Sequence, residues 1–123
     1  MTLFEQIIGE VSEATGAQIE IAPDRVAEIV VDGTVVLVKP TDPVESSVML
    51  FTVLVDGDVG EAQMKAALEM SLFGRGTAGG TIGLFVDSLI YSVSQSLEGL
   101  SAEAFAERLV LFARNAQQIG ECI

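Results

Sequence analysis

The spacing of apolar and polar residues at the beginning of the chain predicts an amphipathic helix over residues 2–15. At about 100° per residue, its charged residues Glu5, Glu10 and Glu13 lie outside the apolar arc. Thr2 and Glu5 have the spacing of a capping box, and Gly16 follows the last turn, so both helix ends are marked. The apolar arc consists of Leu3, Phe4, Ile7, Ile8 and Val11.

Short apolar runs between turn residues predict six β-strands. Asp32-Gly33 is a strong signal for a two-residue hairpin turn, because both central residues of a type I′ turn need positive φ. A tight turn is also expected near Asp87 and Ser88. The runs are residues 18–22, 26–31, 34–38, 47–55, 81–87 and 88–95. The first hairpin should pair Val31 with Thr34, Val30 with Val35, Ile29 with Val36, and Glu28 with Leu37.

This register gives the hairpin two apolar faces. Ile29, Val31, Val36 and Val38 share one face, whereas Val30, Val35 and Leu37 share the other beside Glu28 and Lys39. A single core can bury one face of a sheet. We therefore expect something to cover the second face.

The second predicted helix, at about residues 59–73, is apolar around most of its circumference. Asp58 and Glu61 suggest its capping box, and a charged stripe contains Glu61, Lys65 and Glu69. The other positions include Ala62, Met64, Ala66, Ala67, Leu68, Met70 and Phe73. We expect one side to pack against a second copy of the chain, because 123 residues leave little to cover it. A helix sandwiched within one core remains the alternative.

A third helix is predicted from Ser101 onwards, with Ser101 as its N-cap. Its core stripe contains Phe105, Leu109, Phe112, Ala116 and Ile119, and Val110 and Leu111 lie off this stripe. The element order is α-β-β-β-β-α-β-β-α. The sequence thus predicts one α+β domain over residues 1–123, with helices packed on a twisted, mainly antiparallel sheet.

The glycines of residues 74–83 raise the question of a nucleotide site. Gly74, Gly76 and Gly79 have the spacing G-x-G-x-x-G, which holds a pyrophosphate when the loop leaves a strand and begins a helix. Here a predicted helix precedes the glycines and a predicted strand follows them. We therefore interpret them as a helix-to-strand turn.

Composition argues against several functions. The net charge of −12 disfavours nucleic acid and anionic membranes. The longest strongly apolar run, residues 48–55, is too short to cross a bilayer, and the N-terminus has no basic signal region, which favours a cytoplasmic protein.

Catalysis and cofactor binding have little support in the sequence. The chain has no histidine, and Cys122 is its one cysteine. Residues 56–61 resemble part of a calcium loop but lack its third acidic ligand and distal glutamate. We expect a protein that is not an enzyme and that has no metal or cofactor.

Taken together, the chain resembles the class I type III secretion chaperones of the Tir-chaperone (CesT-like) family. The resemblance rests on size, acidity, element order and the patterns of residues 3–16, 67–87 and 100–119. It implies a homodimer whose interface includes Met64, Ala67, Leu68, Met70, Ile82 and Leu84. It also implies that the N-terminal segment of a secreted effector winds around the dimer in extended form, without ATP.

The candidate effector-binding residues are Leu3, Phe4, Ile7, Val30, Val35 and Leu37, with ordinary core as the alternative for the three helix residues. A different function would be a dimeric α+β adaptor or regulator that binds a folded protein. An enzyme or small-ligand protein built on the glycine turn is a further alternative.

Overall fold

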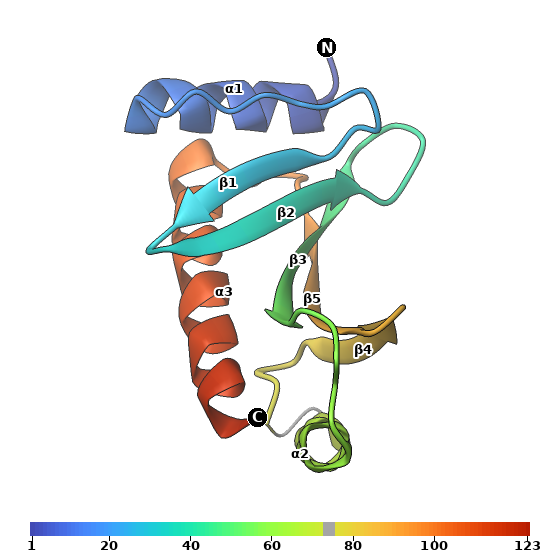
Figure 1. Cartoon of the computed structure of the whole chain (residues 1–123). Helices are drawn as coiled ribbons and strands as arrows, with labels where there is room; N and C mark the ends of the chain where they lie inside the picture. Colours follow the sequence, from blue (N-terminus) through green and yellow to red (C-terminus); the bar gives the residue numbers. More distant parts are fainter. Residues whose placement is uncertain (73–75) are drawn as a thin grey trace.

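Within residues 1–72 and 76–123, the part that the computed structural model describes, the chain forms three helices and one five-stranded sheet (Figure 1). The strands lie in the order β1-β2-β3-β5-β4, and each neighbouring pair is antiparallel. The predicted α+β class is confirmed. The elements are α1 (Leu3–Thr15), β1 (Ala27–Val31), β2 (Thr34–Pro40), β3 (Ser47–Val55), α2 (Glu61–Ser71), β4 (Thr81–Phe85), β5 (Ser88–Ser96) and α3 (Ala102–Cys122).

Local signals at the first helix and first hairpin are confirmed. Thr2 and Glu5 form the capping box of α1, and Gly16 ends the helix with φ of 71°. Asp32 and Gly33 both have positive φ, at 49° and 80°. The four predicted residue pairs between β1 and β2 are all present.

Three boundaries differ from the prediction. Residues 18–22 form only an isolated bridge, Ile21 to Ala27, because their alternating pattern is satisfied by packing of Ile19 and Ile21 against the core. The turn between β4 and β5 consists of residues 86–87 rather than Asp87 and Ser88.

The start of α2 is the third difference. The helix begins after Gly60, whose N–H donates to Gln63 Oε1 at 3.0 Å. Asp58 is not the cap because it adopts a left-handed φ of 50° in the preceding turn. Phe73 and Gly74, at the predicted end of this helix, lie outside the described residues.

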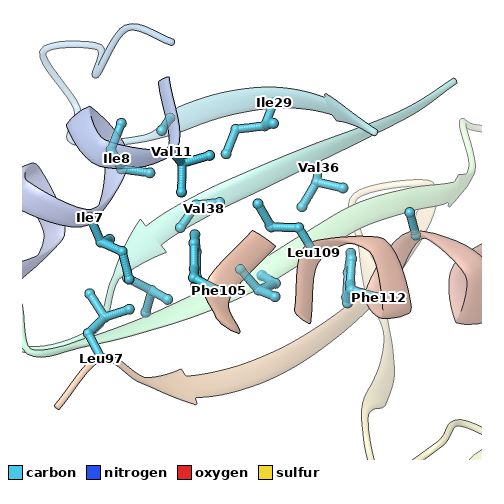
Figure 2. Packing of buried hydrophobic residues seen from close by; sticks show 14 of the residues in the cluster. Ile7, Ile8, Val11, Ile29, Val36, Val38, Leu97, Phe105, Leu109 and Phe112 are labelled. Carbon is cyan, nitrogen blue, oxygen red and sulfur yellow. The ribbon is translucent and has the colours of Figure 1, made fainter. Parts of the chain in front are cut away.

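The core lies between the inner face of the sheet and helices α1 and α3 (Figure 2). Ser101 caps α3 by accepting a hydrogen bond from the Ala104 N–H at 3.1 Å, as predicted. The rings of Tyr91 and Phe112 stack with centroids 5.0 Å apart. The buried residues labelled in Figure 2 are Ile7, Ile8, Val11, Ile29, Val36, Val38, Leu97, Phe105, Leu109 and Phe112.

A polar network attaches the start of α1 to two loops. Arg25 Nε donates to Glu45 Oε2 at 2.8 Å, and Thr2 Oγ1 donates to Glu45 Oε1 at 2.8 Å. The Arg25 guanidinium also lies 5.7 Å from the centre of the Phe4 ring. Hydrogen bonds from Arg25 and Thr2 hold the pKa of Glu45 below its ordinary value. The charged form of Glu45 therefore stabilises the fold.

Replacing Glu45 with glutamine should lower the unfolding midpoint at neutral pH by a few degrees. The midpoint of the variant should also fall less steeply than that of the parent protein as the pH is lowered. A carboxyl with a lowered folded pKa contributes stability that is present above its unfolded pKa and is lost as pH falls through the folded value. Thermal unfolding of Glu45→Gln and the parent protein between pH 3 and pH 7 measures this. Glu13→Gln, on an exposed position of α1, is the control, and equal pH profiles for Glu45→Gln and the parent would contradict the prediction.

Candidate interaction surfaces

The outer face of the sheet is apolar, and α1 and α3 bury residues only on the inner face. Cross-strand pairing places Leu37 beside Phe51, continuing the apolar surface from the first hairpin onto β3. Val30 is 66% exposed and Val53 is 46% exposed. We call this surface the sheet patch, and it comprises Val30, Val35, Leu37, Met49, Phe51 and Val53. Contiguous exposed apolar surface of this kind is typical of interaction sites.

A second apolar surface lies on α2 and the hairpin of β4 and β5. Figure 1 shows α2 beside β4 and away from α1. Ala67 is its one buried residue, whereas Leu68 and Leu72 are 66% and 60% exposed. The hairpin end is also exposed and apolar. We call this surface the α2-hairpin patch, and it comprises Leu68, Leu72, Leu84, Phe85 and Val86.

The turn within the α2-hairpin patch is conformationally strained. Val86 has a φ of 58°, which a β-branched side chain adopts only at a cost of about 1–3 kcal/mol. The same side chain is exposed in the isolated chain. Strained backbone and exposed apolar side chains are both typical of contact sites.

The residues expected at a dimer interface divide into two groups. Leu68 and Leu84 are exposed, and Met64 is half-buried beside a hollow of about 520 Å³ on α2. Ala67 is buried, and Met70 and Ile82 are partly buried and pack against the main core. The second group thus supports α2 and β4, and the first group faces outward.

The residues expected to bind an effector divide in the same way. Val30 and Val35 are exposed, and Leu37 is half-buried on the same face. On α1, Leu3 is exposed, but Phe4 and Ile7 belong to the core with 0% and 4% of their surface exposed. For Phe4 and Ile7 the structure therefore favours the core alternative.

Several surface residues were missed in the sequence. Met49, Phe51 and Val53 belong to the sheet patch, but β3 is apolar on both faces and gives no sign of which residues point outward. Phe85 and Val86 were predicted to lie in the strand of residues 81–87, and no contact role was assigned to them. Met49, Phe51 and Val53 can be placed on the outer face only when the register between β2 and β3 is known. No short hairpin turn joins these two strands, so the sequence does not determine that register.

Charge around the sheet patch is mainly acidic. A groove of about 690 Å³ runs between the connecting segment 18–26 and the outer face of the first hairpin. Val30 and Leu37 form part of its apolar lining, and its acidic residues are Glu20, Asp24 and Glu28. Among the described residues these three carboxylates form no ion pair, since the ion pairs found there join Arg25 to Glu5 and Glu45. The groove therefore favours cationic groups.

The described glycines of residues 76–80 have structural roles. A Cβ atom at Gly76 would lie 2.9 Å from Cβ of Met70, and one at Gly80 would lie 2.6 Å from the Tyr91 ring. Gly79 has φ of 83°. Tyr91 Oη donates to the Thr77 carbonyl at 2.8 Å, and burial raises the pKa of this phenol. These contacts explain Gly76, Gly79 and Gly80 without a ligand, and Gly74 lies outside the described residues.

Neither a metal centre nor a membrane helix is found in the described part of the chain. Residues 1–72 and 76–123 contain no group of three or more cysteine, aspartate or glutamate side chains arranged to hold a metal ion. In the same residues, no helix combines the length and apolar character that crossing a membrane requires.

Comparison with known proteins identifies a family and a shared fold. The family model of the Tir chaperone protein (CesT) family matches residues 6–119. No curated protein sequence matches the chain. The structure is similar to a chain of the HopA1–SchA chaperone–effector complex, with a TM-score of 0.76 and 13% identity, over 97% of this chain and 94% of that chain.

Two further structures have the same fold. The Yersinia pestis type III secretion chaperone SycH, in complex with a stable fragment of YscM2, matches with a TM-score of 0.68 and 18% identity, over 94% of this chain and 98% of that chain. The ExoT–SpcS complex from Pseudomonas aeruginosa contains a chain that matches with a TM-score of 0.67 and 17% identity, over 94% of this chain and 96% of that chain. The family match covers nearly the whole sequence, and the chain belongs to the Tir chaperone protein (CesT) family.

Proposed function

We propose that this protein is a homodimeric export chaperone that holds the N-terminal segment of a type III secreted effector in extended form. The observation that carries the proposal is the sheet patch, an apolar surface spread over three strands that no helix of the described residues covers. Membership of the Tir chaperone family and the fold shared with chaperone–effector complexes support it.

An extended segment suits the shape of this surface. The two hollows described above are open grooves with mixed apolar and charged linings, and the sheet patch is broad. A segment that orders only on binding needs many small apolar contacts, because each contact offsets part of the entropy lost. Val30, Val35 and Leu37 would supply such contacts, with Leu3 at the exposed side of α1.

A second copy of the chain is the proposed cover for the α2-hairpin patch. Leu68 and Leu84 are exposed in the isolated chain, and α2 is attached to the rest of the fold mainly through β4. An isolated helix of 11 residues is marginal in water. Packing of α2 against a partner would bury its outer side and stabilise it.

The proposed role requires no chemistry. Binding would prevent aggregation of the effector segment and leave it unfolded for export. Chaperoning of this kind is not enzymatic. We place this activity in the bacterial cytoplasm, before secretion. The charge of −12 would keep the chaperone dispersed despite its apolar surfaces.

Affinity purification of the tagged protein from the organism that encodes it tests the proposal. We expect one or more secreted proteins to be recovered, each held by two copies of the chaperone, and limited proteolysis to locate the bound region near the effector N-terminus. Val35→Asp with Val53→Asp should reduce this recovery at least tenfold, because the charges would have to be desolvated on binding. Val44→Asp, on an exposed loop position outside the sheet patch, is the control.

A folded cytoplasmic partner that resists proteolysis would contradict the export role and support the adaptor alternative. Full recovery of the effector by Val35→Asp with Val53→Asp would show that the sheet patch is not the binding surface.

A further inference from the structure

The exposed side of α3 is positively charged in an otherwise acidic protein. Residues 108–120 include Arg108 and Arg114 but no aspartate or glutamate, whereas the whole chain has 18 acidic and 6 basic residues. Both arginines are exposed. The local charge along this part of the helix is therefore opposite in sign to the net charge of the protein.

Neither arginine has an acidic partner in the described part of the chain. Side chains three and four positions apart are neighbours on a helix. At those positions around Arg108 and Arg114, the sequence has only alanine, phenylalanine, valine, leucine and glutamine. The ion pairs found within residues 1–72 and 76–123 all involve Arg25. Both guanidinium groups of α3 are thus available to an acidic group of another molecule.

Leu111 lies between the two arginines. It is three residues from each of them, so the three side chains lie on one side of α3. Leu111 is 53% exposed, in contrast to Leu109 of the core stripe, which is 2% exposed. We call this surface the α3 patch, and it comprises Arg108, Val110, Leu111, Arg114 and Asn115.

Two hollows flank Leu111. One, of about 430 Å³, lies on α3 itself and includes Arg114. The other, of about 120 Å³, lies between α3 and strands β3 and β5 and includes Arg108. The first hollow also contains Glu103 and Glu107, towards the start of the helix, whereas no carboxylate of the described residues lines the second. Each hollow thus combines an apolar lining with one arginine.

We propose that the α3 patch binds an acidic segment with apolar side chains from a second protein partner, distinct from the secreted effector. Apolar side chains of this segment would enter the hollows on either side of Leu111. Its aspartate or glutamate side chains would pair with Arg108 and Arg114, because hydrogen bonds between arginine and a carboxylate are stronger than neutral ones. Repulsion by Glu103 and Glu107 would keep these acidic side chains away from the first turns of the helix.

The position of the α3 patch separates this partner from the other two surfaces. Helices α1 and α3 bury residues on the inner face of the sheet, and the sheet patch lies on the outer face. The α2-hairpin patch contains no residue of α3. A chaperone that holds its effector would therefore still present the α3 patch, and a second protein could recognise the loaded complex. The charge of −12 disfavours nucleic acid as the occupant.

Fluorescence anisotropy with synthetic peptides at physiological salt tests the inference on the full chain. The probe is a fluorescein-labelled ten-residue peptide with blocked ends, with leucine at every third or fourth position and glutamate elsewhere. We expect it to bind at least about tenfold more tightly than the same peptide with lysine in place of glutamate, although the net charge of the protein attracts lysine. Replacing the leucines of the probe with serine should also weaken binding.

A charge-changing pair of variants locates the binding site. Arg108→Gln with Arg114→Gln should weaken binding of the leucine-glutamate peptide roughly tenfold, because both charge-assisted contacts are lost. Lys39→Gln with Lys65→Gln makes the same charge change on β2 and α2 and should weaken binding much less. The arginine double variant should still recover the secreted effector at the parent level, because the sheet patch is unchanged.

A second variant tests the apolar part of the α3 patch. Leu111→Ser should weaken binding of the leucine-glutamate peptide several-fold, because less apolar surface is removed from water on binding. Val44→Ser, at another exposed apolar position, is the matched control. Both side chains are exposed, so both variants should keep the parent unfolding midpoint and the parent mass by light scattering.

Equal affinity for the glutamate and lysine peptides, or equal effects of the two charge-changing pairs, would overturn the inference. So would equal binding by Leu111→Ser and Val44→Ser. Equally tight binding of single-stranded oligothymidine with the same charge as the probe would show attraction of anions without recognition of apolar side chains. Loss of effector recovery in the arginine double variant would assign the α3 patch to the effector site, and a changed mass of Leu111→Ser would assign it to self-association. Either of these two results would reject a separate partner.

Discussion

Changing Leu68 and Leu84 to glutamate should convert the protein from a dimer to a folded monomer. Both side chains are more than half exposed in the isolated chain, so the substitutions create no buried charge within one copy. In a dimer built on the α2-hairpin patch, each copy would bring two unpaired carboxylates into the interface. We expect dimerisation to weaken at least about a thousandfold, or roughly 4 kcal/mol. Light scattering should then give a mass near 13.0 kDa.

The control for this experiment is Leu111→Glu. Leu111 is an exposed leucine on α3, outside the α2-hairpin patch, so its substitution should leave the dimer intact. Circular dichroism should show the same secondary structure for all the variants. A double variant that keeps the dimer mass would place the interface elsewhere, and a parent protein that is already monomeric would reject the proposed homodimer.

Changing Gly80 to alanine should destabilise the protein by about 3 kcal/mol. The added Cβ atom would lie 2.6 Å from Cε1 of Tyr91 and 2.7 Å from the Ser92 carbonyl oxygen. The Tyr91 ring cannot move away easily, because it is buried, stacks on Phe112 and donates to the Thr77 carbonyl. Overpacking of a close contact with backbone typically costs 1–3 kcal/mol or more.

Gly83→Ala provides the matched control in the neighbouring strand. A Cβ atom at Gly83 would meet no other atom within 4 Å, and this position has no positive φ. Urea unfolding should therefore show a near-parental midpoint for Gly83→Ala and a much lower midpoint for Gly80→Ala. If the two variants unfold together, the turn is looser than its contacts imply and a ligand role for the glycines would need renewed tests.

Elements whose signals are local could be predicted from the sequence. The capping box of Thr2 and Glu5 and the Asp32-Gly33 turn act over a few residues, and the turn alone fixed the register of the first hairpin. The core stripe of α3 was equally clear, because its apolar residues recur at helical spacing. These features depend on sequence neighbours and on little else.

Features that depend on distant contacts were harder to predict. The alternation of residues 18–22 resembles that of a strand, but Ile19 and Ile21 satisfy it by packing on the core without a ladder. The helical spacing of Phe4 and Ile7 is the same whether the apolar side of α1 faces a partner or the core. The packing of α1 against α3 shows that this side faces the core. The extent of the sheet patch required the pairing of Leu37 with Phe51, which lies between strands joined by a longer loop.

The order of the strands has a consequence for how this protein could diversify. The central pair, β3 and β5, is joined by residues 56–87, and this excursion contains both α2 and β4. The α2-hairpin patch is thus an insertion between two strands whose pairing is set by their own side chains. Because closing a longer loop costs little additional entropy, the excursion can change in length or sequence while the sheet patch and the β1 edge stay in place. With the proposed roles of the α2-hairpin patch and the sheet patch, oligomeric state and cargo preference would evolve independently in one small domain.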